Sequence, residues 1–369
     1  MKPTRTAKQW QRAIVVFIGV AVILTGCTTA ARVPAAVVQP NPIPALSYYY
    51  IWYDTGSWDR AKVDYPTLGR YSSDDVAVMR QHIQWAKAAG ITGFIVSWKS
   101  TDPLNRRLEK LIKVADAENF KLEIIYQGLD FDRKPLPVDR IAADLDYFIE
   151  HYASDKAFYL FDKPVVIWSG IWEFSPEDVA RVTEGRRDRL FILASEKNVD
   201  GYRRVAHAVD GDAYYWSSVN PDTFKGYAEK LTEMGQAVHA NGGLWIAPAA
   251  AGFDARLVGG TTVVDRKDGE TLRQEMDVAV RSAPDAIGLI SWNEFSENSH
   301  IEPSASNGTR YLNVLAGLRL GVTAQVADFD SSEPGNTRNN FDGGRIVALG
   351  LIVALVLTGA ILLARRKPV

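Results

Sequence analysis

Short apolar runs alternate with amphipathic stretches along most of this 369-residue chain. The apolar runs are five to seven residues long and are bounded by turn-forming residues, which is typical of buried β-strands. We predict strands over residues 47–53, 92–98, 121–126, 164–168, 190–194, 212–216, 243–247 and 286–292. In the first stretch between them, Val76, Met79, Ile83 and Ala86 recur at helical spacing, so this stretch is expected to be a helix with one buried face.

Each predicted strand is followed by a predicted helix. We expect helices near residues 74–89, 103–118, 138–152, from 175 onward, 200–207, 222–240, 270–282 and 309–318. Eight strand–helix pairs in about 275 residues match an α/β fold consisting of a single (β/α)8 barrel, or TIM barrel. A doubly wound open sheet is the alternative. No glycine-rich phosphate-binding turn follows the first strand, which counts against a nucleotide-binding sheet of that kind.

The N-terminal 27 residues have a different pattern. Basic side chains come first, an apolar run over residues 13–24 follows, and the segment finishes in Leu24-Thr25-Gly26-Cys27. This order is typical of a secretory signal, and its ending resembles the lipobox of bacterial lipoproteins. We therefore predict acylation at Cys27, with an uncleaved signal anchor as the alternative. Cys27 is the only cysteine, so no disulfide framework is expected.

A second apolar segment lies near the C-terminus. Residues 346–364 carry no charge and are framed by Arg345 and by Arg365-Arg366-Lys367, as expected for a membrane-spanning helix whose basic end stays in the cytoplasm. The predicted order is a signal over 1–27, a tether over 28–45, the barrel over 46–321, a linker over 322–345, the membrane helix over 346–364 and a tail over 365–369. We expect an extracytoplasmic domain held to the cell membrane at both ends.

Composition and charge narrow the range of functions. The chain has 42 basic and 44 acidic residues, so no nucleic-acid partner is expected. Its five histidines have no metal-ligand spacing, and we predict neither a metal nor a cofactor. The Gly-x-Ser-x-Gly motif of serine hydrolases does not occur. Ten tryptophans and fifteen tyrosines suit stacking on sugar rings, although they also serve as core material.

Two carboxylates follow the last predicted strand, in Ser291-Trp292-Asn293-Glu294-Phe295-Ser296-Glu297. Glutamates three positions apart usually lie on a solvated helix face. Here a buried strand precedes them, and strand C-termini carry the active site of a (β/α)8 barrel. Glycosidic cleavage needs one carboxyl group to protonate the leaving oxygen and another to act as nucleophile or base. Glu294 and Glu297 are therefore the candidate catalytic pair.

Other predicted strand ends carry aromatic and hydrogen-bonding side chains. The candidate substrate-binding residues are Tyr50, Trp52, Tyr53, Trp98, Tyr126, Gln127, Tyr215, Trp216, Asp254, Trp292, Asn293 and His300. For any one of them, packing in the core is an equally good interpretation. Together they indicate a site for an oligosaccharide or polysaccharide.

Four motifs, in their order along the chain, resemble glycoside hydrolase family 99. They are Tyr49-Tyr50-Ile51-Trp52-Tyr53, Tyr65-Pro66-Thr67-Leu68-Gly69-Arg70-Tyr71-Ser72-Ser73-Asp74, Ala89-Gly90-Ile91-Thr92-Gly93-Phe94 with Ser97-Trp98, and Ser291 to Glu297 with Ile301-Glu302-Pro303. The family comprises endo-α-mannosidases on a (β/α)8 barrel and is related to the family 71 α-1,3-glucanases. The resemblance, which runs from about residue 47 to about residue 320, implies a retaining endo-α-glycosidase directed at α-mannan.

The resemblance also implies separate roles for the two acids. By position, Glu294 matches the base that takes the proton of the sugar's own 2-hydroxyl group, which attacks the anomeric carbon to give a 1,2-anhydro intermediate. Glu297 matches the acid/base for the leaving group and the water. Glu297 would then need a raised pKa, which we expect its apolar neighbours Trp292 and Phe295 to supply. Phe295, Ser296 and Asn298 stand where the family motif usually has tryptophan, histidine and glycine.

Two other interpretations stay open. The chain could be a non-catalytic glycan-binding envelope lipoprotein, or an α-1,3-glucanase-like hydrolase. A glycosyltransferase-like relative would need an activated sugar donor, which is scarce outside the cytoplasm. The presence of both Glu294 and Glu297 favours a hydrolase, because a protein that only binds glycans needs neither acid.

Overall fold

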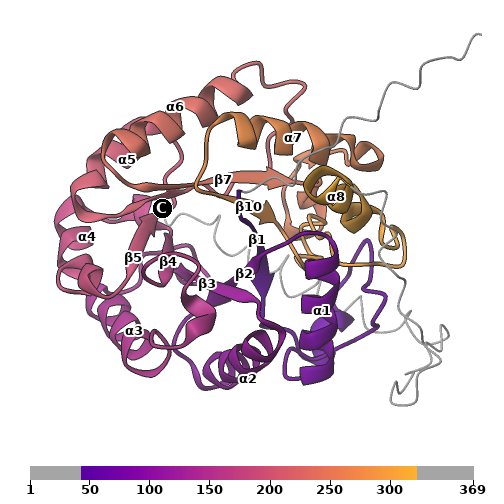
Figure 1. Ribbon diagram of the computed structural model, residues 1–369, viewed down its shortest axis with the longest axis horizontal. Coiled ribbons are helices and arrows are strands. Elements are labelled where there is room, and N and C mark those ends of the chain that lie inside the picture. The colour runs from indigo at the N-terminus through magenta and orange to yellow at the C-terminus, as the bar shows by residue number, and fades with distance from the viewer. Residues whose placement is uncertain (1–42, 322–369) are drawn as a thin grey trace, which may run out of the picture. The chain divides into compact units, whose positions relative to one another are not determined.

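Eight parallel strands close into a barrel in the computed structural model, which describes residues 43–321 (Figure 1). The strands are β1 (Ala45–Tyr50), β2 (Gly93–Trp98), β3 (Lys121–Gln127), β4 (Val165–Ser169), β5 (Phe191–Ala194), β6 (Gly211–Ala213), β7 (Leu244–Ala250) and β10 (Ala286–Ile290). β1 pairs with both β2 and β10, so the sheet has no free edge. The predicted barrel is confirmed, and the open sheet is excluded.

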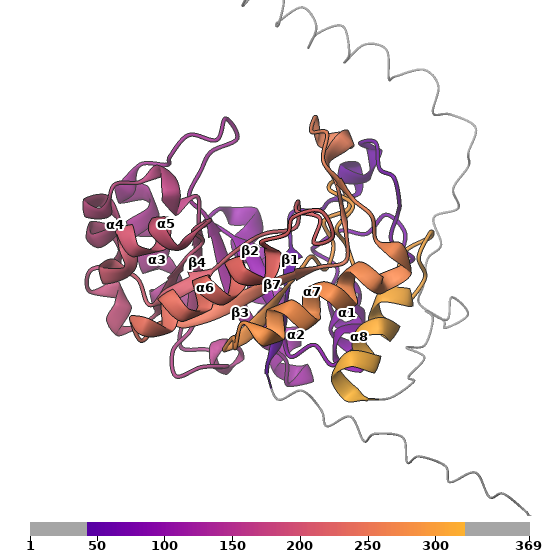
Figure 2. The ribbon, with the colours of Figure 1, turned by 90° about the horizontal axis from the view of Figure 1, so that it is seen from above.

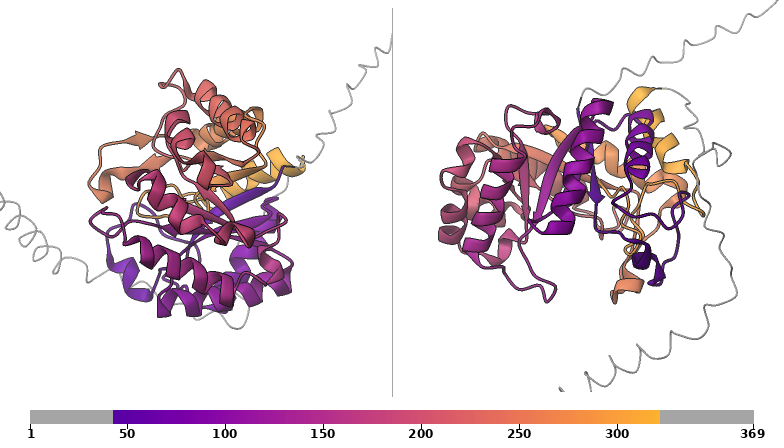
Figure 3. Two further views of the ribbon diagram at one scale, coloured as in Figure 1. Left: turned by 90° about the vertical axis from the view of Figure 1, so that its left-hand side faces the viewer. Right: turned by 90° about the horizontal axis from the view of Figure 1, so that it is seen from below.

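Helices connect consecutive strands and pack around the outside of the barrel, as Figure 3 shows. They are α1 (Val76–Ala88), α2 (Asp102–Glu118), α3 (Val138–His151), α4 (Pro176–Thr183), α5 (Val199–Val205), α6 (Tyr227–Ala240), α7 (Glu270–Arg281) and α8 (Arg310–Leu320). The predicted helix over 222–240 begins later, at Tyr227. The residues before it form turns on Asn220, whose side chain accepts from the Asp222 backbone at 2.9 Å and whose carbonyl accepts from Phe224 at 3.0 Å.

The long loop predicted after the seventh barrel strand contains structure of its own. β8 (Phe253–Asp254) and β9 (Val263–Val264) pair in antiparallel fashion, with a 3-10 turn at Ala255–Val258 between them. This insertion rises above the strand ends (Figure 2). The backbone N–H of Asp254 donates to the Glu297 carbonyl at 2.8 Å, so the insertion is fixed to the loop that carries the two glutamates.

Side chains along each strand alternate between the barrel interior and the helix layer, because successive strand residues point to opposite faces. The buried cluster inside the barrel is formed by Leu46, Tyr48, Ile95, Ile125, Val165, Ile167, Leu193, Ala213, Ile246, Ala250, Ala286 and Ile290. Residues of the other parity, such as Tyr49, Phe94 and Trp168, belong to the larger core shared with the helices. The parity of a residue near a strand end therefore decides whether its side chain faces the interior of the barrel.

Several predictions concern segments at the two ends of the chain. Within residues 43–321, every helix is too short or too polar to cross a bilayer. The predicted signal with Cys27, most of the tether over 28–45, the linker over 322–345, the membrane helix over 346–364 and the tail over 365–369 lie outside the described residues. They stay predictions.

Candidate active site

The loop that follows β10 carries both glutamates and folds back on itself. The Ser291 N–H donates to the Ser299 carbonyl at 3.0 Å, and the Ile301 N–H donates to the Ser291 carbonyl at 2.9 Å. The Ser291 hydroxyl accepts from the Glu294 backbone at 2.9 Å. These bonds close residues 291–301 into a compact turn, so the two glutamates do not lie on a helix face. The turn follows the C-terminal end of a barrel strand, which is where (β/α)8 enzymes hold their active sites.

Glu294 is nearly buried, with 7% of its surface exposed. Its Oε1 accepts from the Ser296 backbone at 3.0 Å. Burial, followed by the charge of Glu297, raises the pKa of Glu294 to about 7. A carboxylate with this pKa is a stronger base than an ordinary one and is half ionised near neutral pH, which suits a general base.

Glu297 is half-buried beside Glu294, and burial raises its pKa too. This is the direction expected for an acid that holds its proton near neutrality. Burial is the cause that was expected, although Trp292 itself is fully buried against Phe94, with ring centroids 5.2 Å apart, in the helix layer. The charge of Glu297 opposes ionisation of Glu294. Two acids coupled in this way favour states in which one is protonated and the other ionised.

Two cations that the sequence analysis missed act on the pair. Lys62, half-buried in the connection between β1 and α1, lowers the pKa of Glu294 by its charge, against the larger effect of burial. Arg133, in the connection between β3 and α3, lowers the pKa of Glu297 in the same way. Neither lies in a motif or at a strand end, so only the folded chain reveals them.

The Lys62→Met variant is expected to raise the pKa of Glu294 above about 7, because it removes a positive charge that favours the carboxylate. Titration of the glutamate carboxyl carbons by NMR would measure this shift. Lys113→Met, at an exposed position of α2, is the matched control and should leave the titration unchanged. An unchanged Glu294 titration in Lys62→Met would show that Lys62 does not act on the pair.

Tyr50 and Tyr215 lie beside the two acids. Their hydroxyl groups are 2.7 Å apart, and the charges of Glu294 and Glu297 add to burial in raising the pKa of both tyrosines. Trp52 is 45% exposed and packs on Tyr50, with ring centroids 4.3 Å apart. The structure therefore brings these three predicted residues together with the acids, and Trp52 offers an aromatic surface to a ligand.

Gln127, at the end of β3, has the parity of Ile125 and faces the barrel interior. Its Oε1 is buried and has no hydrogen-bond partner within residues 43–321. A buried amide oxygen without a partner is costly. It is therefore a candidate acceptor for a ligand hydroxyl group.

Four predicted substrate-binding residues are corrected by the structure. Trp98, Tyr126, Trp216 and Trp292 are buried and face the helices. The indole N–H of Trp98 donates to Asn105 at 2.9 Å, and the hydroxyl of Tyr126 donates to Asp144 at 2.9 Å. The Trp216 ring stacks on Tyr227. Trp98 and Tyr126 have the strand parity that points outward, whereas Trp216 and Trp292 follow the ends of β6 and β10. All four stabilise the packing of helices on the barrel.

Asn293 and Tyr53 hold the glutamate loop in place. The Asn293 side chain accepts from the Tyr50 backbone N–H at 2.8 Å and donates to the Tyr50 carbonyl at 3.0 Å, so it bridges the ends of β10 and β1. The Tyr53 hydroxyl donates to the Asn293 carbonyl at 2.7 Å. Both side chains are buried, so their role is to position the loop that carries the two glutamates.

A buried carboxylate lies behind this loop. Glu302 accepts from the Tyr71 hydroxyl at 2.9 Å and lies 3.1 Å from Nε2 of His82. The Asn293 side chain also donates to the Tyr71 hydroxyl, at 3.2 Å. Tyr71, His82 and Glu302 thus connect α1 and the loop after β1 to the residue beside Glu294.

His300 and Asp254 also support the loop. His300 is fully buried, stacks on Phe295 with centroids 4.0 Å apart, and has its Nε2 3.2 Å from Asp64. Burial lowers the pKa of His300 to about 4, so the ring is neutral near pH 7. Asp254 is buried and its carboxylate is paired with Arg256 at 2.6 Å. Both residues position the segment that carries the acids.

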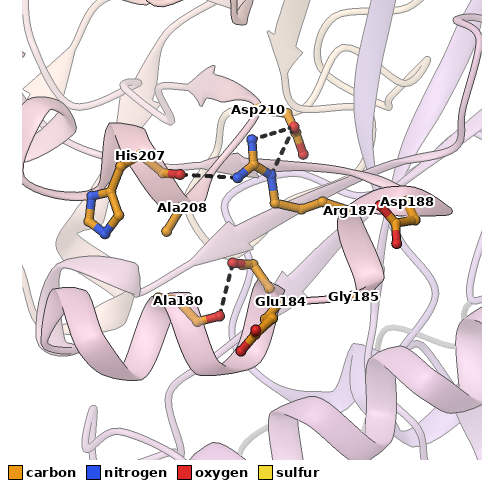
Figure 4. A pocket seen from close by; sticks show the side chains of 9 residues that line it. Ala180, Glu184, Gly185, Arg187, Asp188, His207, Ala208 and Asp210 are labelled. Atoms are coloured by element: carbon orange, nitrogen blue, oxygen red, sulfur yellow. Dashed lines mark hydrogen bonds and ion pairs between the residues drawn. The ribbon is translucent and has the colours of Figure 1, made fainter.

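A hollow of about 620 Å³ lies elsewhere on the barrel (Figure 4). Its lining includes Glu184, Arg187, His207 and Asp210, and Arg187 is paired with Asp210 at 2.9 Å. These residues precede β5 and β6, so the hollow lies at the N-terminal ends of the strands, opposite the glutamates. In the part of the chain that the structure describes, no three His, Asp or Glu side chains are grouped to hold a metal ion.

The sequence of this chain is similar to those of known glycoside hydrolases. The sequence profile of Glycosyl hydrolase family 99 matches residues 53–317. Glycoprotein endo-alpha-1,2-mannosidase of Rattus norvegicus is 21% identical over 300 residues, which cover 73% of this chain and 64% of that protein. Glycoprotein endo-alpha-1,2-mannosidase-like protein of Mus musculus is 22% identical over 377 residues. The match covers 82% of this chain and 81% of the mouse protein. This chain thus spans less than two thirds of the length of the rat protein.

The solved structures include a related barrel. The GH99 endo-alpha-mannosidase from Bacteroides thetaiotaomicron superposes with a TM-score of 0.62 at 22% identity. The match covers 72% of this chain and 88% of the bacterial one. At this identity, the likeness establishes a shared fold.

Proposed function

Since this chain belongs to glycosyl hydrolase family 99, we propose that it is a retaining endo-α-glycosidase that cleaves α-mannan with Glu294 and Glu297. One observation carries the proposal. Two acids, buried or half-buried, lie side by side after the last barrel strand, each with a raised pKa and each opposed by one cation. Such a pair can remove one proton and deliver another at the same bond.

In the first step, Glu294 takes the proton of the 2-hydroxyl group of the sugar on the non-reducing side of the bond. The freed oxygen attacks the anomeric carbon, the glycosidic C–O bond breaks, and Glu297 gives its proton to the leaving oxygen. A 1,2-anhydro sugar and a shortened glycan result. This mechanism follows from the family resemblance and needs no bond between sugar and protein.

In the second step, Glu297 takes a proton from water, whose oxygen attacks the anomeric carbon. The bond between that carbon and O2 breaks, and Glu294 returns its proton to O2. The anomeric carbon is inverted twice, so its configuration is retained, and both acids regain their starting states. We expect the hydroxyl groups of Tyr50 and Tyr215, which lie beside the acids, to bond the sugar during both steps.

The substrate and the location of the activity are further parts of the proposal. The names of the rat and mouse relatives, which are endo-alpha-1,2-mannosidases, support an α-mannan substrate. The predicted lipid anchor at Cys27 and the predicted membrane helix over 346–364 support an enzyme tethered to the outer face of the cell membrane. The substrate would then be an extracellular or envelope glycan.

We expect the protein to release oligosaccharides from α-1,2-linked mannans, with the α-anomer formed first. Retention follows from two inversions at one carbon. Proton NMR of the products during the first minutes would identify the anomer. α-1,3-glucan and other α-glucans serve as comparison substrates.

Other results would point elsewhere. Initial release of the β-anomer would contradict the two-step scheme. Cleavage of α-1,3-glucan alone would replace mannan as the substrate. Glycan binding without any cleavage would favour the non-catalytic lipoprotein.

A further inference from the structure

The connection between β3 and α3 is a pre-formed turn. A bridge between Leu129 and Pro135 closes its base. Oδ1 of Asp130 accepts from the backbone N–H groups of Asp132 and Lys134, both at 2.9 Å. At Arg133 the backbone enters the left-handed region, with φ of 64°. Bonds within residues 130–134 therefore fix the conformation of the tip, which we call the Asp130–Lys134 turn.

This turn exposes an aromatic ring. Phe131 has a relative exposure of 101%, whereas the next most exposed large apolar residue within residues 43–321, Val63, has 54%. Single exposed apolar residues are common and usually need no explanation. Phe131 differs because it lies at the tip of a turn whose backbone is held by the Asp130 carboxylate, so the turn fixes where the ring is presented. The ammonium group of Lys99, which follows β2, lies 5.6 Å from the centre of its ring.

The same turn reaches the catalytic pair. Arg133, two residues after Phe131, lowers the pKa of Glu297 by its charge. The turn also stands on the same side of the barrel as the β8–β9 insertion (Figure 2). Phe131 therefore lies at the C-terminal face of the barrel, where it is more exposed than either acid.

Trp52, which follows β1, packs on Tyr50 beside the acids and is half exposed. An enzyme that cleaves within a chain must hold sugar units on both sides of the bond. Aromatic faces bind the apolar faces of pyranose rings, and a nearby ammonium group can donate to their hydroxyl groups. Phe131 with Lys99 offers both kinds of group at one place.

We propose that the Asp130–Lys134 turn is a substrate-binding arm in which Phe131 stacks on a sugar unit at least one position removed from the unit attacked by Glu294. This inference rests on the proposed function, because the occupant is a further part of the same α-linked glycan. It makes Phe131 a determinant of chain-length specificity. Longer oligosaccharides gain the contact, and the shortest substrates do not reach it.

The test compares wild type and Phe131→Ala on reducing-end-labelled α-manno-oligosaccharides of increasing length. Loss of one stacking contact is expected to raise KM for the long substrates about fivefold to tenfold, with kcat unchanged and with no effect on the shortest cleaved substrate. Phe131→Trp should keep the wild-type values. Tyr159→Ala is the matched control, because Tyr159 is an exposed aromatic residue that precedes β4 at the opposite end of the barrel.

The outcomes separate this inference from the proposed function. Equal KM values for wild type and Phe131→Ala at every length would overturn the arm while leaving the proposed glycosidase intact. If wild type cleaves none of the substrates, calorimetric binding of the same oligosaccharides decides. Weaker binding to Phe131→Ala would then support the arm and reject catalysis, and equal binding or no binding would reject the arm. Arg133→Ala should shift the pH profile, which Phe131→Ala leaves in place.

Discussion

Glycan cleavage is expected to fall by about a thousandfold or more when either Glu294 or Glu297 is replaced by glutamine. Glutamine keeps the size and the hydrogen-bonding shape of glutamate but neither accepts the hydroxyl proton nor delivers one to the leaving oxygen. Each variant therefore lacks one half of the proton transfer. Initial rates on α-1,2-mannan would measure the loss, with circular dichroism to confirm the fold. Glu150→Gln, at an exposed position of α3, is the control and should match wild type.

A substrate with a good leaving group separates the two roles. A 2,4-dinitrophenyl group departs without protonation, so Glu297→Gln should keep much of its first-step rate on a dinitrophenyl mannoside. Glu294→Gln should stay inactive, because attack by the 2-hydroxyl group still needs a base. Equal rescue of both variants, or near-wild-type rates in either on mannan, would contradict the assignment.

The pH profile gives a further check on the same roles. Because the pKa of Glu294 is about 7, activity should rise as the pH passes upward through this value and the carboxyl group ionises. In Lys62→Met the rise should lie at higher pH. A profile that falls through this range would mean that Glu294 acts in its protonated form.

Glu302→Ala is expected to lower the free energy of unfolding by about 3–5 kcal/mol. The carboxylate is buried and accepts from the Tyr71 hydroxyl, and it lies 3.1 Å from His82. Its removal leaves two buried polar groups without their partner and opens a cavity between α1 and the loop after β10. Urea denaturation followed by tryptophan fluorescence would measure the change.

Two further variants make this result specific. Glu302→Gln keeps an acceptor oxygen and should lose less stability than Glu302→Ala. Glu150→Ala should change the free energy of unfolding by less than about 0.5 kcal/mol, because its side chain is exposed. If Glu302→Ala were as stable as Glu150→Ala, the buried network would not contribute to stability. Activity should also fall in Glu302→Ala, since Tyr71 bonds to Asn293 beside Glu294.

The barrel and the position of the loop that carries Glu294 and Glu297 could be predicted from the sequence because each depends on local pattern. Apolar runs of strand length specify strands, and their alternation with helices specifies the barrel. A last strand followed by Glu294 and Glu297 places those acids at the C-terminal face. What the pattern left undecided was the direction of individual side chains. Tyr126 and Gln127 are neighbours near the end of β3, yet Tyr126 bonds to α3 and Gln127 faces the interior.

The positions of Lys62 and Arg133 could not be predicted from the sequence for a different reason. Each lies in a connecting segment with no strand, helix or motif to fix its position in space, and each reaches an acid more than 150 positions away in the chain. Charge relationships of that kind depend on how loops fold over the barrel. In the same way, the bonds that fix the turn carrying Phe131 are made by one carboxylate, that of Asp130. The composition of this segment does not predict them.

The bond between Asn293 and the Tyr50 backbone joins positions 243 residues apart. The first and last barrel strands meet at this point, and the ordering of so long an intervening chain carries a large entropic cost before the contact forms. The acids are therefore brought into place only by the closure that completes the barrel. A chain interrupted before β10 lacks both acids and leaves β1 and β7 without their shared neighbour. A truncated or incompletely closed chain is therefore expected to have no glycosidase activity.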